Sequence, residues 1–283
     1  MIVLQKRNHS DNRFKMNIYI QTIRWNLILY KECLKNFFRE LANYPTFFRE
    51  AHTLRRQLVA YGSPWLIRKA MPLLLEKPSA GGVNSGRGHY FFQDLWAARH
   101  IYRANPKRHV DVGSRVDGFI AHVAVFREIE MIDIRPVDEI ENVKSLVADF
   151  MQPNMPYEAI CDSASSLSVI EHFGLGRYGD PIDVNGAMKG MINLHRLLKP
   201  GGTLYFSVPI GPLSIVFNAH RIFSLDYLLN EMFQGRFTLD EFSFVDDAGF
   251  LHENIPLTDD VIRTNAGCSF GCGLFRLIKT QQC

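Results

Sequence analysis

Three aspartates end three successive β-rich runs of the sequence: Asp111, Asp133 and Asp149. A carboxylate at the end of a second strand can accept hydrogen bonds from both hydroxyls of a ribose, which predicts that Asp133 binds a nucleoside. Asp149 stands beside Phe150 and can accept a hydrogen bond from an adenine amino group. The three acids in this order therefore predict a site for a nucleoside-containing cofactor.

The stretch HVDVGSRVDGF, residues 109–119, predicts a strand, a tight turn and the start of a helix. Glycine suits a turn that needs positive φ or a close approach of the backbone to a ligand. No Gly-Lys-Ser/Thr follows, and the spacing is not Gly-x-Gly-x-x-Gly, so the loop is neither a P-loop nor a dinucleotide loop. The loop residues predicted to contact the cofactor are Asp111, Gly113, Ser114, Arg115 and Gly118.

Strand and helix patterns alternate along the second part of the chain. A helical pattern runs through YFFQDLWAARHIYRA, residues 90–104, and shorter apolar runs follow it. This alternation predicts an α/β fold, a Rossmann-like, doubly wound, mostly parallel sheet with helices on both faces. Ligands bind such sheets at the carboxyl ends of the strands, where the three aspartates stand. The predicted strands are 109–112, 130–134, 145–148, 159–163, 203–208 and 274–278.

An amphipathic helix, a Lys-Pro-Gly-Gly turn at 199–202 and a β-rich strand follow one another in MKGMINLHRLLKPGGTLYFSVP. With this segment, residues 89–283 resemble the class I S-adenosylmethionine-dependent methyltransferases. The resemblance implies that S-adenosylmethionine is the cofactor: the loop from Asp111 to Gly113 would wrap its methionine part, Asp133 would hold its ribose, and Asp149 would contact its adenine. It also implies methyl transfer, which we expect at an oxygen atom.

A narrower similarity comes from the segments GHYFFQDLWAAR and VDVGSRVDGF. They resemble a methyltransferase-like family of unknown function, seen in nematodes and in bacterial surface-polysaccharide gene clusters. This resemblance implies a role in polysaccharide biosynthesis and a small-molecule or glycan-linked acceptor.

The glycine loop departs from the family pattern, which reads Asp/Glu-x-Gly-x-Gly-x-Gly, because Arg115 and Asp117 replace its second and third glycines. One interpretation is that Arg115 pairs with the carboxylate of the cofactor. The other is that Arg115 points to solvent and Asp117 caps the following helix. The departure also leaves open a domain that binds a nucleoside or a protein partner without transferring a group. A further alternative, an NAD-dependent oxidoreductase, lacks its Gly-x-Gly-x-x-Gly loop here.

The candidate catalytic residues follow the predicted fourth strand, in CDSASSLSVIEHFGLGRYGDP. Methyl transfer depends on alignment of the reacting atoms, and a hydroxyl acceptor also needs a base, a role that Glu171 and His172 can serve. The alternative is that Glu171 caps a helix and His172 packs at its start. Related quinone O-methyltransferases have a further glutamate three residues before this pair and bind a metal. Ser168 stands there in this chain, so no metal is predicted.

Three more residues are predicted to lie near the acceptor. His220 and Arg221 follow the fifth strand. We expect a catalytic role for His220, and binding of a phosphate or carboxylate by Arg221, whose guanidinium suits both groups. Tyr90, at the start of the predicted helix, is the other candidate for substrate binding.

The first 108 residues are basic, with 19 Lys and Arg against 6 Asp and Glu, and the remainder is acidic. Apolar residues three and four positions apart predict a helix at 20–44 that ends at Pro45, a second helix at 47–61 and a short helical segment at 63–72. We therefore predict a basic helical N-terminal region at 1–78, a Gly/Ser-rich linker at 79–88 and a methyltransferase-like domain at 89–283.

The basic helical region has three interpretations. It covers its own catalytic domain, pairs with a second subunit through residues 16–44, or lies on an anionic membrane surface. Five scattered cysteines predict reduced thiols, and the lack of a signal-like apolar segment predicts a cytoplasmic protein, free or peripheral to a membrane. The sequence shows no nucleic-acid module, so no specific nucleic-acid partner is predicted.

Overall fold

The computed structural model describes residues 31, 34, 38, 44–70 and 88–280. The chain divides into two compact units, Met1–Arg49 and Glu50–Cys283, whereas the sequence predicts a boundary at 79–88. Most of the segment proposed for dimerisation or membrane contact, 16–44, and nearly all of the predicted linker lie outside the described residues. No helix in the described ranges is long and apolar enough to cross a membrane.

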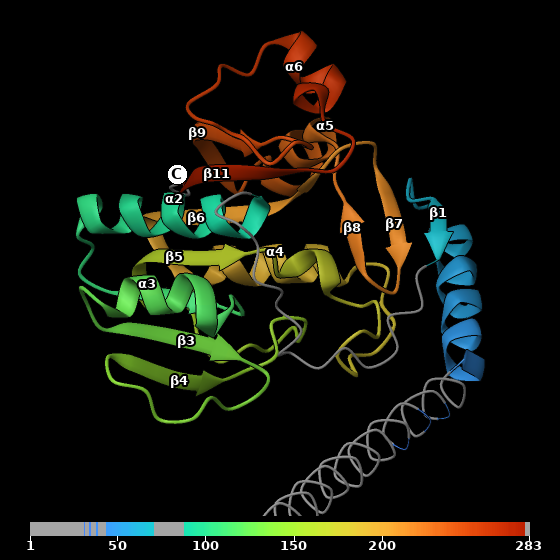
Figure 1. The fold of residues 1–283 in the computed structure, drawn as a ribbon, viewed down its shortest axis with the longest axis horizontal. Coiled ribbons are helices and arrows are strands. Elements are labelled where there is room, and N and C mark those ends of the chain that lie inside the picture. The colour runs from blue at the N-terminus through green and yellow to red at the C-terminus, as the bar shows by residue number, and fades with distance from the viewer. Residues whose placement is uncertain (1–30, 32–33, 35–37, 39–43, 71–87, 281–283) are drawn as a thin grey trace, which may run out of the picture. The chain divides into compact units, whose positions relative to one another are not determined.

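The larger unit is built on an eight-stranded sheet with the order β10-β9-β11-β6-β5-β2-β3-β4 (Figure 1). The strands β6, β5, β2, β3 and β4 are parallel to one another. The other three, β11, β9 and β10, join the sheet by antiparallel pairing. The strands are β2 (His109–Val112), β3 (Ile129–Asp133), β4 (Val143–Val147), β5 (Cys161–Leu167), β6 (Leu198–Ile210), β9 (Phe237–Val245), β10 (Leu251–His252) and β11 (Gly271–Lys279).

The predicted doubly wound, mostly parallel sheet is confirmed, and each of the six predicted strands overlaps an observed one. The chain order reverses between β2 and β5, because β3 and β4 extend the sheet on one side and β6 extends it on the other. Such a reversal is the point at which open α/β sheets bind ligands, outside the carboxyl ends of the strands. The candidate site therefore lies at the carboxyl ends of β2 and β5.

Helices cover both faces of the sheet. On one face, α2 (His89–Ala104), η1 (Val116–Ile120) and α3 (Ala121–Ala124) bury a cluster that includes Trp96, Phe119 and Tyr205. On the other face lie α4 (Gly186–Leu197) and η3 (Leu228–Phe233), where Phe233 packs edge-on against Phe206. Tyr205 and Phe206 are neighbours on β6 and face opposite sides, as the alternation of a strand requires. The remaining short helices are η2 (Ile170–His172), α5 (Leu225–Tyr227), α6 (Asp259–Thr264) and η4 (Asn265–Gly267).

A second, three-stranded sheet corrects the prediction of a helical segment at 63–72. Its order is β1 (Ile67–Ala70), β7 (Ser214–Phe217), β8 (His220–Ile222), with β1 parallel to β7. The Ser63 hydroxyl accepts a hydrogen bond from the Trp65 N–H at 3.4 Å and so forms a turn. Trp65 then packs edge-on against Phe223 and Tyr227. Pairing with a distant strand has therefore overridden the local helical pattern.

Two further local predictions need adjustment. Residues 44–60 are helical and include Pro45, where the sequence predicts a helix end. Because the fixed φ of proline is itself helical, proline need not end a helix at its own position. The Lys-Pro-Gly-Gly turn at 199–202 lies inside β6, where the pairing register with β5 shifts between Cys161 and Ser163, so this segment forms an irregularity of the strand.

Candidate active site

Asp111, the first predicted cofactor ligand, is buried in a network of its own neighbours. Its carboxylate accepts hydrogen bonds from the Ser114 N–H at 2.9 Å, the Ser114 hydroxyl at 2.7 Å and the Ser165 hydroxyl at 2.5 Å. The Ser114 hydroxyl also accepts a hydrogen bond from the N–H of Leu167 at 3.1 Å. Burial raises the pKa of Asp111 to about 6. Asp111 and Ser114, both predicted to contact the cofactor, therefore hold the loop against β5.

The loop needs glycine at positions 113 and 118 because neighbouring protein atoms leave no room for a side chain. Gly113 has a φ of 72°, and a Cβ there would lie 2.6 Å from Cγ1 of Val169. A Cβ on Gly118 would collide with the carboxylate of Asp94 on α2. A larger residue at either position would displace the loop. The contact at Gly118 also shows that the Asp94 carboxylate lies directly against the loop.

Arg115 and Asp117, the two departures from the family pattern, form an ion pair with each other. The Arg115 Nε donates to Oδ1 of Asp117 at 3.1 Å, and Nη2 donates to Oδ2 at 2.9 Å. The guanidinium lies 5.1 Å from the centre of the Tyr90 ring, whose pKa is raised to about 12, by burial first and also by the Glu171 carboxyl. Asp117 lies inside η1, whose N-cap residue is Arg115, and no side chain of the described residues caps this helix. The charge of Arg115 is therefore already compensated within the loop.

We expect Arg115→Gly to change the affinity for S-adenosylhomocysteine less than about threefold, because an exposed ion pair contributes little and Arg115 already has a carboxylate partner. Isothermal titration calorimetry of the native and variant proteins measures this difference. A loss of tenfold or more would instead show that Arg115 binds the carboxylate of the ligand.

Asp133, the predicted ribose ligand, stands at the end of β3 and is paired with Arg135. Oδ1 of Asp133 accepts from the backbone N–H and from Nε of Arg135, both at 2.9 Å, and Oδ2 accepts from Nη2 at 3.2 Å. The Arg135 guanidinium also lies 5.4 Å from the ring centre of Tyr178, and that of Arg177 lies 5.2 Å from it. Both carboxylate oxygens that a ribose would use are thus engaged by a half-exposed arginine.

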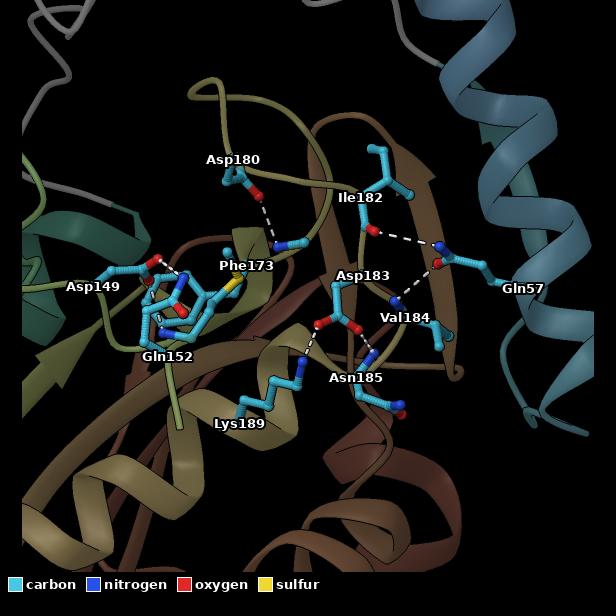
Figure 2. A network of polar contacts seen from close by, with 12 residues as sticks. Gln57, Asp149, Gln152, Phe173, Asp180, Ile182, Asp183, Val184, Asn185 and Lys189 are labelled. Carbon is cyan, nitrogen blue, oxygen red and sulfur yellow. Dashed lines mark hydrogen bonds and ion pairs between the residues drawn. The ribbon is translucent and has the colours of Figure 1, made fainter. Parts of the chain in front are cut away.

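Asp149, the predicted adenine ligand, stabilises the turn that follows β4 (Figure 2). Its Oδ1 accepts from the Met151 N–H at 2.8 Å, and its Oδ2 accepts from the Gln152 side chain at 2.9 Å. Phe150 is buried beneath this turn, where its carbonyl accepts from the side chain of Asn193 at 2.8 Å. Gln152 is exposed, so Asp149 can exchange this partner for a ligand donor more easily than Asp111 can exchange its own.

Glu171 and His172 lie side by side in η2, directly after β5. Glu171 is 2% exposed, and its Oε2 accepts no hydrogen bond within the described part of the chain. Burial raises the pKa of Glu171 to about 8. His172 Nδ1 lies 2.6 Å from the carbonyl oxygen of Ala219, which can only accept, so Nδ1 carries the proton and Nε2 the lone pair. Burial first, with the positive charge of Arg177, lowers the pKa of His172 to about 3.

The loop after η2 is held in place by polar contacts from several elements (Figure 2). Oδ2 of Asp180 accepts from the Gly174 N–H at 2.7 Å. From the helical segment 44–60, Gln57 donates to the carbonyl of Ile182 and accepts from the Val184 N–H, both at 3.3 Å. These contacts close the loop that carries Arg177 and Tyr178 and fix it beside Glu171.

Arg221, which the sequence predicts to bind substrate, has backbone partners in this scaffold. It is fully buried, and its terminal nitrogens donate to the backbone carbonyls of Phe173, Asp183 and Val184. Its guanidinium also lies 5.9 Å from the Trp65 ring. Arg221 thus ties β8 to both ends of the loop after η2.

His220 and Tyr90, two residues predicted to lie near the acceptor, both lie near Arg177. His220 stacks on Phe270 with ring centres 5.0 Å apart, and burial lowers its pKa to about 4. The positive charge of Arg177 contributes to the pKa shifts of Tyr90, Glu171, His172 and His220, so these groups surround one cation. The structure therefore brings three predicted catalytic residues and Tyr90 together around Arg177, which the sequence reasoning missed.

Two residues of α2 were also missed. Oε1 of Gln93 accepts hydrogen bonds from the hydroxyls of Ser168 and Ser207, both at 2.8 Å, and thereby joins α2 to the ends of β5 and β6. Asp94 is 6% exposed, and burial raises its pKa to about 7. The available signal is a Gln-Asp pair inside the apolar run FFQDLW, where two adjacent polar residues fall on the buried side of a helix.

The strand order of the sheet, with the candidate site residues at the carboxyl ends of its parallel strands, is that of the class I methyltransferase fold. Residues 109–254, more than half of the chain, match the family described as "Caenorhabditis protein of unknown function, DUF268". The chain belongs to this family, which confirms the nematode part of the narrower resemblance. No curated protein matches the sequence.

Several solved structures are similar to this chain at low sequence identity. The N-methyltransferase NodS from Bradyrhizobium japonicum is 13% identical, with 74% of this chain and 95% of NodS covered and a TM-score of 0.46. The 4+2 cyclase SpnF is 14% identical, with 82% and 93% covered and a TM-score of 0.49. A phosphoethanolamine N-methyltransferase from Haemonchus contortus is 13% identical, with 71% and 56% covered and a TM-score of 0.45. A fold alone does not fix a reaction, so the function of this chain depends on its own site residues.

Proposed function

We propose that this protein binds S-adenosylmethionine at the carboxyl edge of its sheet and transfers the methyl group to an oxygen of a small-molecule or glycan-linked acceptor. The observation that carries the proposal is Glu171, a buried carboxyl directly after β5, one oxygen of which accepts no hydrogen bond from the residues that the structure describes. Such a group is costly to bury and is characteristic of functional sites. It follows β5, one of the two strands between which the strand order reverses, and only β2 separates β5 from the strand that ends at Asp133.

The residues present fit this cofactor if Arg135 moves. Asp133 offers two carboxylate oxygens at the end of β3, and Arg135 is half-exposed, so the cost of separating the pair is about 1 kcal/mol or less. The cofactor, when bound, supplies the electrophilic methyl group. The chain would hold the ribose with Asp133 and the adenine side with Asp149, and would close the reaction site with Tyr90 and the loop that carries Arg177.

Glu171 is the strongest candidate for the base. A useful base has a pKa near the working pH, and burial brings that of Glu171 to about 8. The pKa values of His172 and His220 are lowered to about 3 and about 4, so both remain neutral and weakly basic. We therefore assign proton removal from the acceptor to Glu171 and a positioning role to His172, whose Nε2 lies 3.8 Å from Oε1 of Glu171.

Arg135→Ala is expected to strengthen binding of S-adenosylhomocysteine about threefold to fivefold, because the ribose no longer competes with an intramolecular ion pair for Asp133. Calorimetric titration of both proteins gives the two dissociation constants. Lys144→Ala is a suitable control, since its ion pair with Glu128 is exposed and lies at the opposite end of the strands. Weaker binding by Arg135→Ala would indicate that Arg135 itself contacts the ligand.

The Asp133–Arg135 pair also favours a second candidate function. A chain that has lost cofactor binding together with transfer activity, and binds a protein partner instead, would have no reason to keep Asp133 available. Titration of the folded protein with S-adenosylmethionine, S-adenosylhomocysteine and NAD in parallel separates the candidates. Heat with the first two ligands supports the proposal, whereas no heat with either contradicts it, and heat with NAD alone would favour an oxidoreductase.

A further inference from the structure

Asp94 occupies an unusual position between α2 and the glycine loop. Its Oδ1 accepts a hydrogen bond from the side chain of Gln93 at 3.2 Å. Its Oδ2 lies against Gly118, where any side chain would collide with it, and accepts no hydrogen bond from the described residues. Asp94 is 6% exposed. One oxygen of a buried carboxyl is therefore directed at the loop without a partner.

No cation forms an ion pair with Asp94 in the described ranges, although charged groups surround it. Arg115, which follows the loop turn, is committed to Asp117, and Nδ1 of His122 on α3 donates to the Gly118 carbonyl at 2.7 Å. Asp111 of β2 adds a second acid on the other side. The thiol of Cys272 on β11 also lies near, because Asp94 contributes to raising its pKa. A buried carboxylate in such surroundings is stabilised by a cation that a ligand brings.

We propose that Asp94 binds the α-ammonium group of the amino-acid end of S-adenosylmethionine. The inference rests on the proposed function and deepens it by naming the residue that recognises this end of the cofactor. The resemblance assigns the methionine end to the loop that starts at Asp111. However, both oxygens of Asp111 are occupied by Ser114 and Ser165. Asp94 is the acid at the same loop with an oxygen to spare.

The test compares two adenosine thioethers, S-adenosylhomocysteine and 5′-methylthioadenosine, of which only the first carries an ammonium group. In Asp94→Asn we expect the affinity for S-adenosylhomocysteine to fall roughly tenfold to hundredfold, because a hydrogen bond to a charged group is lost. The affinity for 5′-methylthioadenosine should stay within about twofold, which also shows that the variant is folded. Asp260→Asn, an exposed pair with Arg263 on α6, is the matched control and should change neither affinity.

The outcomes separate the inference from the function on which it rests. An equal loss of both ligands in Asp94→Asn would show that Asp94 only shapes the loop and would overturn the inference, while the proposed function would stand. Failure of the native protein to bind either ligand would overturn the proposed function itself. Selective loss of S-adenosylhomocysteine supports both.

The pH dependence of binding gives a second readout. Burial raises the pKa of Asp94 to about 7, so an arriving ammonium group should displace its proton. Affinity of the native protein for S-adenosylhomocysteine should then rise between about pH 6 and pH 8, and that for 5′-methylthioadenosine should not. The second ligand controls for Asp111, whose pKa is also raised. A flat profile for S-adenosylhomocysteine, or the same slope in Asp94→Asn, would contradict the assignment.

Discussion

Asp133→Ala is expected to weaken binding of S-adenosylmethionine at least a hundredfold. A ribose offers two hydroxyl donors to this carboxylate, and hydrogen bonds to charged acceptors contribute about 1.5–3 kcal/mol each, which together correspond to roughly two to four powers of ten in affinity. Separation of Asp133 from Arg135 offsets only about 1 kcal/mol of this gain, because Arg135 is half-exposed. Isothermal titration calorimetry at constant pH and ionic strength measures the change.

The double variant Asp133→Ala, Arg135→Ala is the control for this prediction. If Asp133→Ala acted only by freeing Arg135 to repel the sulfonium, the double variant would recover native affinity. If Asp133 binds the ribose, the double variant remains as weak as the single one. A loss smaller than about threefold in Asp133→Ala, in protein with native thermal stability, would contradict the ribose assignment.

Glu171→Gln is expected to lower turnover by roughly two to four powers of ten while leaving the affinity for S-adenosylmethionine unchanged, because a positioned base contributes about that much. Turnover of the native protein should rise with pH through about 8, the pKa of Glu171, and level off above it. The measurement is the initial rate of methyl transfer to a hydroxyl acceptor as a function of pH. His172→Ala should also spare binding and lower turnover, but less, since its imidazole is weakly basic.

Thermal stability gives a check on Glu171 that needs no acceptor. Burial raises its pKa from 4.5 to about 8 in the folded state, so the folded protein holds a proton that the unfolded chain releases between these values. This contribution to the free energy of unfolding is complete below pH 4.5 and is lost as the pH rises through 8. Melting temperatures of Glu171→Gln should therefore fall less than those of the native protein between about pH 5 and pH 9. Parallel curves would show that Glu171 is not a buried ionisable group.

The central strands could be predicted from the sequence because each is a short buried run between turn signals. β2, β3 and the aspartates that end them follow from this local pattern alone. β1 could not be predicted in this way, because it becomes a strand through its pairing with β7, almost 150 residues later along the chain. The helical spacing around Ser63 was a weaker signal than this tertiary contact.

The site was predicted less completely than the fold, because residue type does not reveal which partners a side chain already has. Arg221 has the chemistry of an anion ligand, but it is buried and bound to backbone carbonyls. Asp133 was placed correctly at a strand end, and the ion pair with Arg135, two residues later, became visible only in the structure. Asp94 was missed because a single acid on an amphipathic helix is usually solvated.

The pairing of β1 with β7 bears on where the folding unit begins. A chain that started at residue 89, as the motif pattern suggests, would lack the strand that covers the outer edge of β7 and the Gln57 contacts with the loop after η2. Its unpaired edge would offer backbone donors and acceptors to other chains, which is a common route to aggregation. We therefore expect a stable fragment of this protein to need the residues from about Glu50 onward, well before residue 109, where the match to the family begins.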